Sequence, residues 1–148
     1  MTRIDLAPMT KAELRLINHL VKESLSQGFQ FISRLVREYN AGLNCFNKPG
    51  EMLLRASAKG RIIGICGLNT DPYLNDSKIG RLRHLYVESA WRKKGVGLLL
   101  VNKLIHEAKQ HYELITLRTD TSAADEFYRK LGFRTEPIIQ HATHHLKL

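Results

Sequence analysis

Long apolar runs, clustered cysteines and a leader pattern are all missing from this sequence. No apolar run approaches the ~18 residues of a membrane-spanning helix, and the first five residues lack the apolar core of a signal peptide. The two cysteines, Cys45 and Cys66, lie far apart without metal-type spacing. These absences predict a cytoplasmic protein with two reduced thiols, no membrane partner and no metal.

Repeats and low-complexity segments are also absent from the 148 residues. A chain of this length buries roughly two thirds of its unfolded surface when it folds. Its 43% hydrophobic and 25% charged residues are an ordinary globular composition. We therefore expect one domain over residues 1–148, with a core that needs no disulfide.

Acidic residues are scarce relative to basic ones: 14 Asp and Glu against 23 Lys and Arg, a formal net charge of +9. Such an excess is compatible with nucleic-acid binding. However, the cations are scattered, and only Arg92, Lys93 and Lys94 form a cluster. A basic surface also suits a small polyanionic ligand. Nucleic acid therefore remains the weaker alternative.

The hydrophobic pattern predicts an α/β fold. Thr10 and Glu13 form a capping box before a helix, and Lys59-Gly60 is typical of a hairpin turn. That first helix should bury Leu14, Ile17, Leu20 and Val21. Further helices are expected over 29–40, 95–111 and 123–131, the second of these burying Val96, Leu99, Leu100, Leu104 and Ile105. Strands are expected over 2–6, 51–57, 61–68, 79–87 and 113–119, followed by two closing strands that run to residue 148.

A basic segment with two glycines, Trp91-Arg92-Lys93-Lys94-Gly95-Val96-Gly97, precedes the helix expected over 95–111. Glycine lets the backbone approach a ligand closely, and a helix N-terminus offers unpaired N–H groups and partial positive charge. The segment is therefore a candidate phosphate site. It is no Walker loop, because no Gly-Lys-Ser or Gly-Lys-Thr follows. It is no dinucleotide fingerprint, because Leu100 replaces the third glycine.

Two motifs resemble those of the GNAT superfamily of acetyl-CoA-dependent N-acetyltransferases. The first is Arg92-x-x-Gly95-x-Gly97, directly after a strand that ends in Leu85-Tyr86-Val87. The second, over 124–133, is similar to the family's later helix and Gly-Phe turn. The resemblance is close over 79–134. It implies the GNAT fold, a mixed sheet of about six to seven strands splayed at the cofactor site and flanked by about four helices.

The same resemblance implies the reaction and the donor site. Acetyl would pass from acetyl-CoA to a primary amine by direct attack in a ternary complex, without a cysteine nucleophile. The main chain of Leu85, Tyr86 and Val87 would pair with the pantetheine arm, and backbone N–H groups would hold the pyrophosphate. Those N–H groups belong to Arg92, Lys93, Lys94, Gly95, Val96, Gly97 and Leu98. Thr121, Ala124 and Tyr128, the last near the thioester sulfur, complete the cofactor-binding set, although Thr121 replaces an asparagine that often contacts the pantetheine in the family.

Tyr128 is the first catalytic candidate. The resemblance gives it the role of general acid toward the departing thiolate. A tyrosine beside Phe127 on an amphipathic helix is also typical of simple core packing, which is the alternative.

The general base is less defined. Many family members carry a glutamate in the strand before the later helix, but Thr116 stands there and cannot accept a proton. His84 is the substitute candidate, and strand alternation puts it on the same face as Tyr86. The alternative is a hydrogen-bonded structural histidine. Glu88 and Asp120 are further candidates.

Three C-terminal histidines, His141, His144 and His145, at first suggest a metal site. Strand alternation separates His144 from the other two, and no nearby Cys or carboxylate completes a ligand set. We expect an ordinary strand surface here.

The acceptor is left open. Phe29, Phe31 and the Cys45-Phe46 loop lie where the GNAT fold usually builds its acceptor pocket, and the acceptor could be a small-molecule or a protein amine. The net positive charge of the protein argues mildly against a polycationic acceptor. Another acyl-CoA, or a non-catalytic CoA-binding or regulatory domain, remains an alternative, the latter because the glutamate is missing. Homodimers are frequent in the family.

Overall fold

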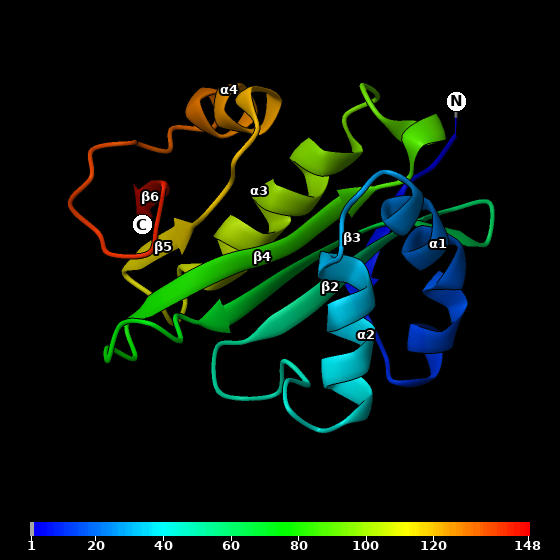
Figure 1. The fold of residues 1–148 in the computed structure, drawn as a ribbon, viewed down its shortest axis with the longest axis horizontal. Helices are drawn as coiled ribbons and strands as arrows, with labels where there is room; N and C mark the ends of the chain where they lie inside the picture. The colour runs from blue at the N-terminus through cyan, green and yellow to red at the C-terminus, as the bar shows by residue number, and fades with distance from the viewer. Residues whose placement is uncertain (1) are drawn as a thin grey trace.

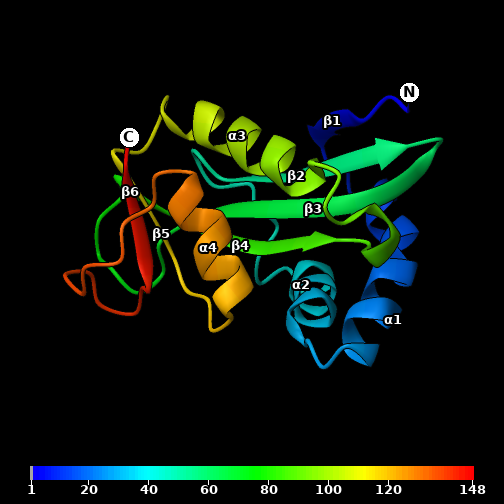
Figure 2. The same cartoon turned by 90° about the horizontal axis from the view of Figure 1, so that it is seen from above.

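Within residues 2–148, which the computed structural model describes, six strands form one mixed sheet with helices on both faces (Figures 1 and 2). The strands are β1 (Asp5–Pro8), β2 (Met52–Ala58), β3 (Arg61–Thr70), β4 (Ile79–Val87), β5 (Leu114–Leu117) and β6 (His144–Lys147). The helices are α1 (Asn18–Ser26), α2 (Phe31–Asn40), α3 (Val96–Ala108) and α4 (Ser122–Lys130), with 3₁₀ turns at Ala12–Ile17 and Ser89–Trp91. The predicted fold class is confirmed. In the same residues, no helix is long and apolar enough to cross a membrane.

The sheet separates two hydrophobic clusters. α1 and α2 cover one face and α3 covers the other, as Figure 2 shows. α3 buries one stripe at helical spacing, made of Val96, Leu100, Val101, Leu104 and Ala108. The prediction that Leu99 is buried is wrong, because this side chain is 43% exposed. Val101 takes the inward position instead.

The sheet is open along part of β4. The strand order is β1-β2-β3-β4-β5-β6, antiparallel except for the parallel pair β4–β5. β4 runs to Val87, but it pairs with β5 only from Ile79 to Arg81. Beyond Arg81 the two strands diverge, so the later half of β4 has β3 on one side and, among residues 2–148, no strand on the other (Figure 1).

Local signals explain most element ends. The capping box forms, with the Thr10 amide 2.9 Å from Glu13 Oε1 and the Glu13 amide 3.2 Å from Thr10 Oγ1. It opens a 3₁₀ turn before α1 instead of a single α-helix. Lys59 and Gly60 make the hairpin turn with φ of 53° and 74°. α2 begins at Phe31 and not at residue 29, because Gly28 turns the chain with φ of 85°.

The two ends of the chain depart from the prediction. β1 covers Asp5–Pro8 instead of residues 2–6, paired with β2 from Asp5 to Pro8. Only one closing strand forms. The other is reduced to a single bridge between Arg134 and His145, because the chain leaves the sheet as a loop before β6.

Candidate functional site

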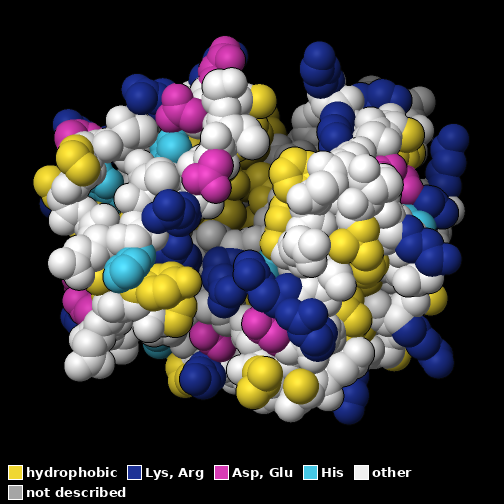
Figure 3. Space-filling model, viewed as in Figure 1, with side chains coloured by type: hydrophobic (Ala, Val, Ile, Leu, Met, Phe, Trp, Pro, Cys, Tyr) yellow, Lys and Arg dark blue, Asp and Glu magenta, His cyan; other side chains and the backbone are white. Residues whose placement is uncertain are grey.

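A cleft of about 1180 Å³ lies where β4 and β5 diverge. Its walls come from β4, the start of α3, α4 and the N-terminal part of α2. Figure 3 shows hydrophobic side chains inside a hollow on this face and a group of Lys and Arg side chains over β4 and α2. The cleft therefore joins elements that are far apart in the sequence.

The start of α3 forms one end of the cleft. Gly95 precedes the helix in the left-handed region, with φ of 86°, and no side chain caps the amides that follow. The first bond back into the helix is from the Leu99 amide to the Gly95 carbonyl, at 3.0 Å. The amides just before Leu99 therefore lack intrahelical partners. With Lys93 also at positive φ, 61°, the segment forms an anion-binding concavity.

Gly97 supports the same interpretation. A Cβ built at Gly97 would lie 3.6 Å from Phe127, which is ordinary van der Waals contact. Packing within the protein therefore does not require glycine here. A ligand that approaches the backbone closely would require it. The arrangement fits a pyrophosphate.

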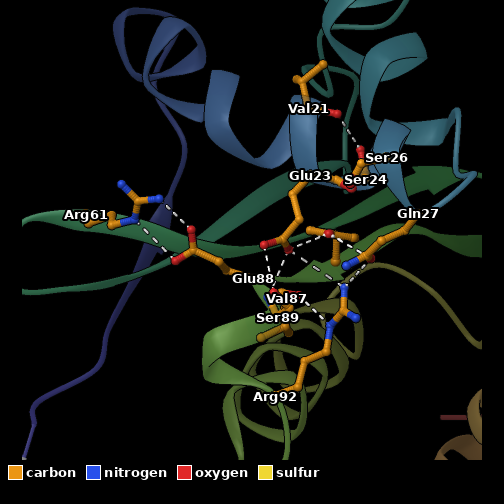
Figure 4. Close-up of polar contacts among 11 residues, drawn as sticks. Val21, Glu23, Ser24, Ser26, Gln27, Arg61, Val87, Glu88, Ser89 and Arg92 are labelled. Carbon is orange, nitrogen blue, oxygen red and sulfur yellow. Dashed lines mark hydrogen bonds and ion pairs between the residues drawn. The ribbon is translucent and has the colours of Figure 1, made fainter.

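Arg92 does not offer a free amide. Its N–H donates to the Ser89 carbonyl at 3.3 Å. Its guanidinium turns back, with Nε 2.9 Å from the Val87 carbonyl and Nη2 2.8 Å from Gln27 Oε1 (Figure 4), and lies over the Tyr86 ring. Arg92 thus ties the loop to α1, and the expected main-chain anion site begins after it.

Glu23 also joins α1 to this loop, and no pattern in the sequence indicated this role. Its carboxylate accepts from the Tyr86 hydroxyl at 2.6 Å and from the amide and hydroxyl of Ser89, each at 2.8 Å (Figure 4). Burial acts to raise the pKa of Glu23, but the hydrogen bonds from Tyr86 and Ser89 leave it below its ordinary value. Glu23 stands 66 residues before Ser89 in the chain, so only the fold brings them together.

The open edge of β4 presents alternate main-chain groups. The Glu88 amide donates to Ile63 on β3, at 2.7 Å, and Tyr86 is in register with Ile65. Because N–H and C=O groups alternate in direction along a strand, Leu85 and Val87 turn theirs toward the cleft. The expectation that Tyr86 also offers its main chain to a ligand is wrong, since Tyr86 belongs to the β3–β4 ladder.

His84 occupies an irregularity in β4. Its φ is 61°, and the β3–β4 register shifts between Ile65 and Gly67, as in a β-bulge. Its ring lies 6.4 Å from the Phe31 ring, and Tyr86 lies 6.1 Å from the same ring. The expected common face of His84 and Tyr86 is confirmed.

The environment of His84 is unusual. The residue is 7% exposed, and neither ring nitrogen has a hydrogen-bond partner among residues 2–148. By hydrogen-bond geometry the alternative of a structural histidine lacks a partner, although the Phe31 main chain acts to raise the pKa of the ring. Burial, helped by the charges of Arg83 and Arg34, lowers the pKa of His84 to about 3. The ring is therefore neutral, and both of its nitrogens are buried without a partner among residues 2–148.

Tyr128 lies on α4 at the boundary of core and cleft. It is 5% exposed and lines the cleft. Its ring packs edge-on against Phe127 and Phe133, with centroids 5.1 and 5.4 Å away. Burial raises the pKa of its hydroxyl well above the ordinary value. The phenol is therefore held protonated beside the cleft.

Thr116 is structural. It is fully buried, and its hydroxyl donates to Asp71 Oδ2 at 2.5 Å. The same carboxylate oxygen lies 3.5 Å from Arg81 Nη1, and Arg81 Nη2 donates to the His141 carbonyl at 2.8 Å. This buried network joins β4, β5 and the loops beside them. It leaves Thr116 without a part in proton transfer.

The other predicted site residues either make structural contacts within the protein or line the cleft. Thr121 is the N-cap of α4, where its hydroxyl accepts from the Ala124 amide at 3.2 Å. Both carboxylate oxygens of Glu88 accept hydrogen bonds from Arg61, one from Nε and one from Nη2, which leaves Glu88 poorly suited to act as a base. Asp120 is exposed on the cleft wall. Among the expected acceptor residues, Phe29 and Phe31 line the cleft. Phe46 instead packs behind His84.

The C-terminal histidines are not a strand surface, contrary to expectation. His144 is buried, with Nε2 2.7 Å from Asp125 and Nδ1 2.8 Å from Thr143. His141 lies before β6 and stacks on Tyr73 at 4.8 Å. Across residues 2–148, no group of three or more His, Cys, Asp or Glu side chains is placed to hold a metal ion.

Neither cysteine is disulfide-bonded. Cys66 is fully buried, and burial raises the pKa of its thiol. Cys45 is partly buried, and its Sγ donates to the Tyr39 carbonyl at 3.6 Å. A buried thiol with a raised pKa is a poor nucleophile.

Comparison with solved structures finds the same fold. A protein from Exiguobacterium sp. 255-15, proposed to be an acetyltransferase, is 26% identical, with a TM-score of 0.85 over 98% of this chain and 93% of that one. The GNAT family N-acetyltransferase YhbS from Escherichia coli, solved in complex with CoA, is 18% identical, with a TM-score of 0.73 over 99% of this chain and 82% of that one. YncA from Salmonella typhimurium, solved with acetyl-CoA, is 15% identical, with a TM-score of 0.73 over 98% and 94%.

Sequence comparison agrees. An uncharacterised N-acetyltransferase from Methanocaldococcus jannaschii is 26% identical over 78 residues, which are 51% of this chain. The chain spans about a third of that relative's length, 34%. The model of the acetyltransferase (GNAT) family matches residues 21–133, which include the splayed strand, the uncapped helix and Tyr128. The chain belongs to the GNAT family of acetyltransferases.

Proposed function

We propose that this protein transfers acetyl from acetyl-CoA to a primary amine, by direct attack of the amine within a ternary complex. One observation carries the proposal: the open edge of β4 leads from the uncapped start of α3 to His84, with Tyr128 on the facing helix. Donor, acceptor and proton-transfer groups can therefore meet in one cleft.

The donor substrate would be held mainly by main-chain groups. The amides from Lys93 to Leu98 would receive the pyrophosphate. The main-chain groups of Leu85 and the amide of Val87, which turn into the cleft, would pair with the pantetheine arm as an added strand does; the Val87 carbonyl already accepts from Arg92. Such pairing sets the thioester beside the backbone, where an N–H can stabilise charge on its carbonyl oxygen.

Tyr128 would complete the transfer as general acid. The amine nitrogen forms a bond to the thioester carbon, the carbon–sulfur bond breaks, and the sulfur receives the phenolic proton. A phenol held protonated by burial is suited to this task. Neither cysteine takes part, so no acetyl-enzyme forms.

His84 would accept the proton that the attacking amine loses, directly or through water. Its neutral ring and free nitrogens support this role. A pKa of about 3 makes it a weak base. Burial is the main cause of that low pKa, and the positive charges of Arg83 and Arg34 add to it.

The test is a thiol-release assay with acetyl-CoA across amine classes, with Tyr128→Phe as the matched variant. Turnover of an amine by the natural protein, with the acetyl group found on nitrogen, supports the proposal. Tight CoA binding with no turnover on any amine would instead support a non-catalytic CoA-binding domain, the alternative favoured by Thr116 in place of the glutamate. Acetylation of Cys45 or Cys66 that an amine then discharges would contradict direct attack.

A further inference from the structure

The cleft carries an unneutralised positive charge on its α2 side, away from the start of α3. Arg34, Arg81 and Arg83 all line it there. Arg81 is paired with Asp71. Neither Arg34 nor Arg83 forms a salt bridge with any residue from 2 to 148. Asp120 is the one carboxylate among the described lining residues, and it belongs to the segment before α4 on the facing wall.

Arg83 is half-buried and poorly satisfied. Its one hydrogen bond to a described residue goes to a neutral group, Asn69 Oδ1, at 3.3 Å. Burial, with the positive charges of Arg34 and Arg81 adding to it, outweighs Glu38 and lowers the pKa of Arg83. A partly desolvated guanidinium without an anion costs free energy. An anion entering the cleft would remove that cost.

The bulge in β4 turns two consecutive side chains to this place. In a regular strand, Arg83 and His84 would point to opposite faces. With His84 at φ of 61° and the register shifted beside it, both lie toward α2: the His84 ring is 6.4 Å from the Phe31 ring, and the charges of Arg34 and Glu38 act on Arg83. A strained residue that re-aims side chains into a cavity is a feature of functional sites. His84, with both nitrogens unpartnered and 7% exposed, is the second sign that a ligand belongs here.

Resting on the function proposed above, we propose that the acceptor is an amine that also carries an oxyanion, a carboxylate or a phosphate, which Arg83 and Arg34 bind beside His84. The planar guanidinium matches both anions. The apolar walls of Phe29 and Phe31 receive the rest of the molecule. Polyamines and other polycations are excluded by the same charges.

The anion would also assist the chemistry. The charges of Arg83 and Arg34 contribute to the low pKa of His84, after burial. An acceptor anion between them would offset these charges and strengthen His84 as a base at the moment an amine is present.

The test uses acceptor pairs that differ only in the anion: amino acids against their amides for carboxylate, and O-phosphoethanolamine against ethanolamine for phosphate. The natural protein is expected to prefer the anionic member by roughly ten- to a hundredfold in kcat/KM, the range of a hydrogen bond to a charged group. Arg83→Gln should abolish the preference, and Arg83→Lys should retain part of it. Arg37→Gln removes an equal charge from the same face of α2 outside the cleft and should change nothing.

Two outcomes would overturn the inference: equal turnover of both members, or a preference that survives in both Arg83→Gln and Arg34→Gln. A melting curve of each variant separates misfolding from lost recognition. A second measurement does not need turnover. N-acetyl amino acids and their amides are titrated calorimetrically into the CoA-bound protein, where tighter binding of the anionic product supports the inference and equal binding refutes it. Failure of every amine to consume acetyl-CoA would reject the proposed function, and the titration would still decide the anion site.

Discussion

The two ends of the cleft are built from different parts of the polypeptide. At the start of α3, the groups turned to the ligand are backbone amides from one continuous segment, and glycine at 97 keeps side chains away. On the α2 side, the groups are side chains of Arg34, Arg83 and His84, supplied by two elements that only the fold brings together. Because backbone amides do not depend on side-chain identity, the first end suits a part of the ligand that many different proteins bind. The binding preference of the second end can change with each substitution of a side chain.

Tyr128 stands between the two ends, and its loss should have the largest effect. Tyr128→Phe keeps the ring and its packing but removes the proton donor, so kcat should fall by ~10²–10⁴-fold, the usual contribution of a general acid. The dissociation constant for CoA should stay the same, because neither end has changed. Steady-state kinetics and calorimetry measure the two quantities. An unchanged kcat would remove Tyr128 from the mechanism.

Gly97→Val tests the main-chain end alone. The added side chain would enter the space in front of the amides, and donor affinity should fall by roughly ten- to a hundredfold, the loss of a hydrogen bond to a charged group. The melting temperature should change little, since the Cβ meets only ordinary contacts. Asn102→Ala, on the exposed side of the same helix, is the control. Full CoA affinity in Gly97→Val would place the pyrophosphate elsewhere.

His84 tests the side-chain end through pH. The pKa of His84 is about 3 in the folded protein against an ordinary value of 6.5, so between these pH values the unfolded chain binds a proton that the folded protein does not. The stabilisation is complete above about pH 6.5 and is lost as pH falls toward 3. Between pH 6 and 5 the free energy of unfolding should drop by about 1 kcal/mol more in the natural protein than in His84→Asn. Parallel urea titrations at both pH values measure it, and equal slopes would mean that His84 is already charged or exposed.

The same contrast explains what the sequence could and could not predict. The donor end rests on local signals: a strand, a turn with glycines and an amphipathic helix, all within residues 79–97. Arg83 and His84 lie on the same side of β4 because of a β-bulge, and the spacing of residues in the sequence does not predict this bulge. Glu23, bound to Tyr86 and Ser89, is likewise invisible in the sequence because the contacts span more than 60 residues.

The errors at the C-terminus have a similar origin. Alternation over residues 134–148 suggested two strands and an exposed histidine face, but His144 is drawn inward by its bond to Asp125 on α4. A tertiary contact thus outweighed the local pattern. Arg92 lies in the segment predicted to hold the pyrophosphate, but its amide and guanidinium bind groups of the protein itself. Sequence patterns identify a functional segment more readily than they identify which of its amides and side chains face the ligand.

The unpaired half of β4 has a consequence for the protein as a whole. The Leu85 main chain and the Val87 amide face away from β3, where β5 has already diverged, while the Val87 carbonyl accepts from Arg92. A donor that pairs there becomes, in effect, a seventh strand made of another molecule. We expect its binding to protect these two amides from hydrogen exchange and to raise the midpoint of thermal unfolding with donor concentration. Binding of the donor would therefore complete the hydrogen bonding at this edge of the sheet and make the edge more rigid.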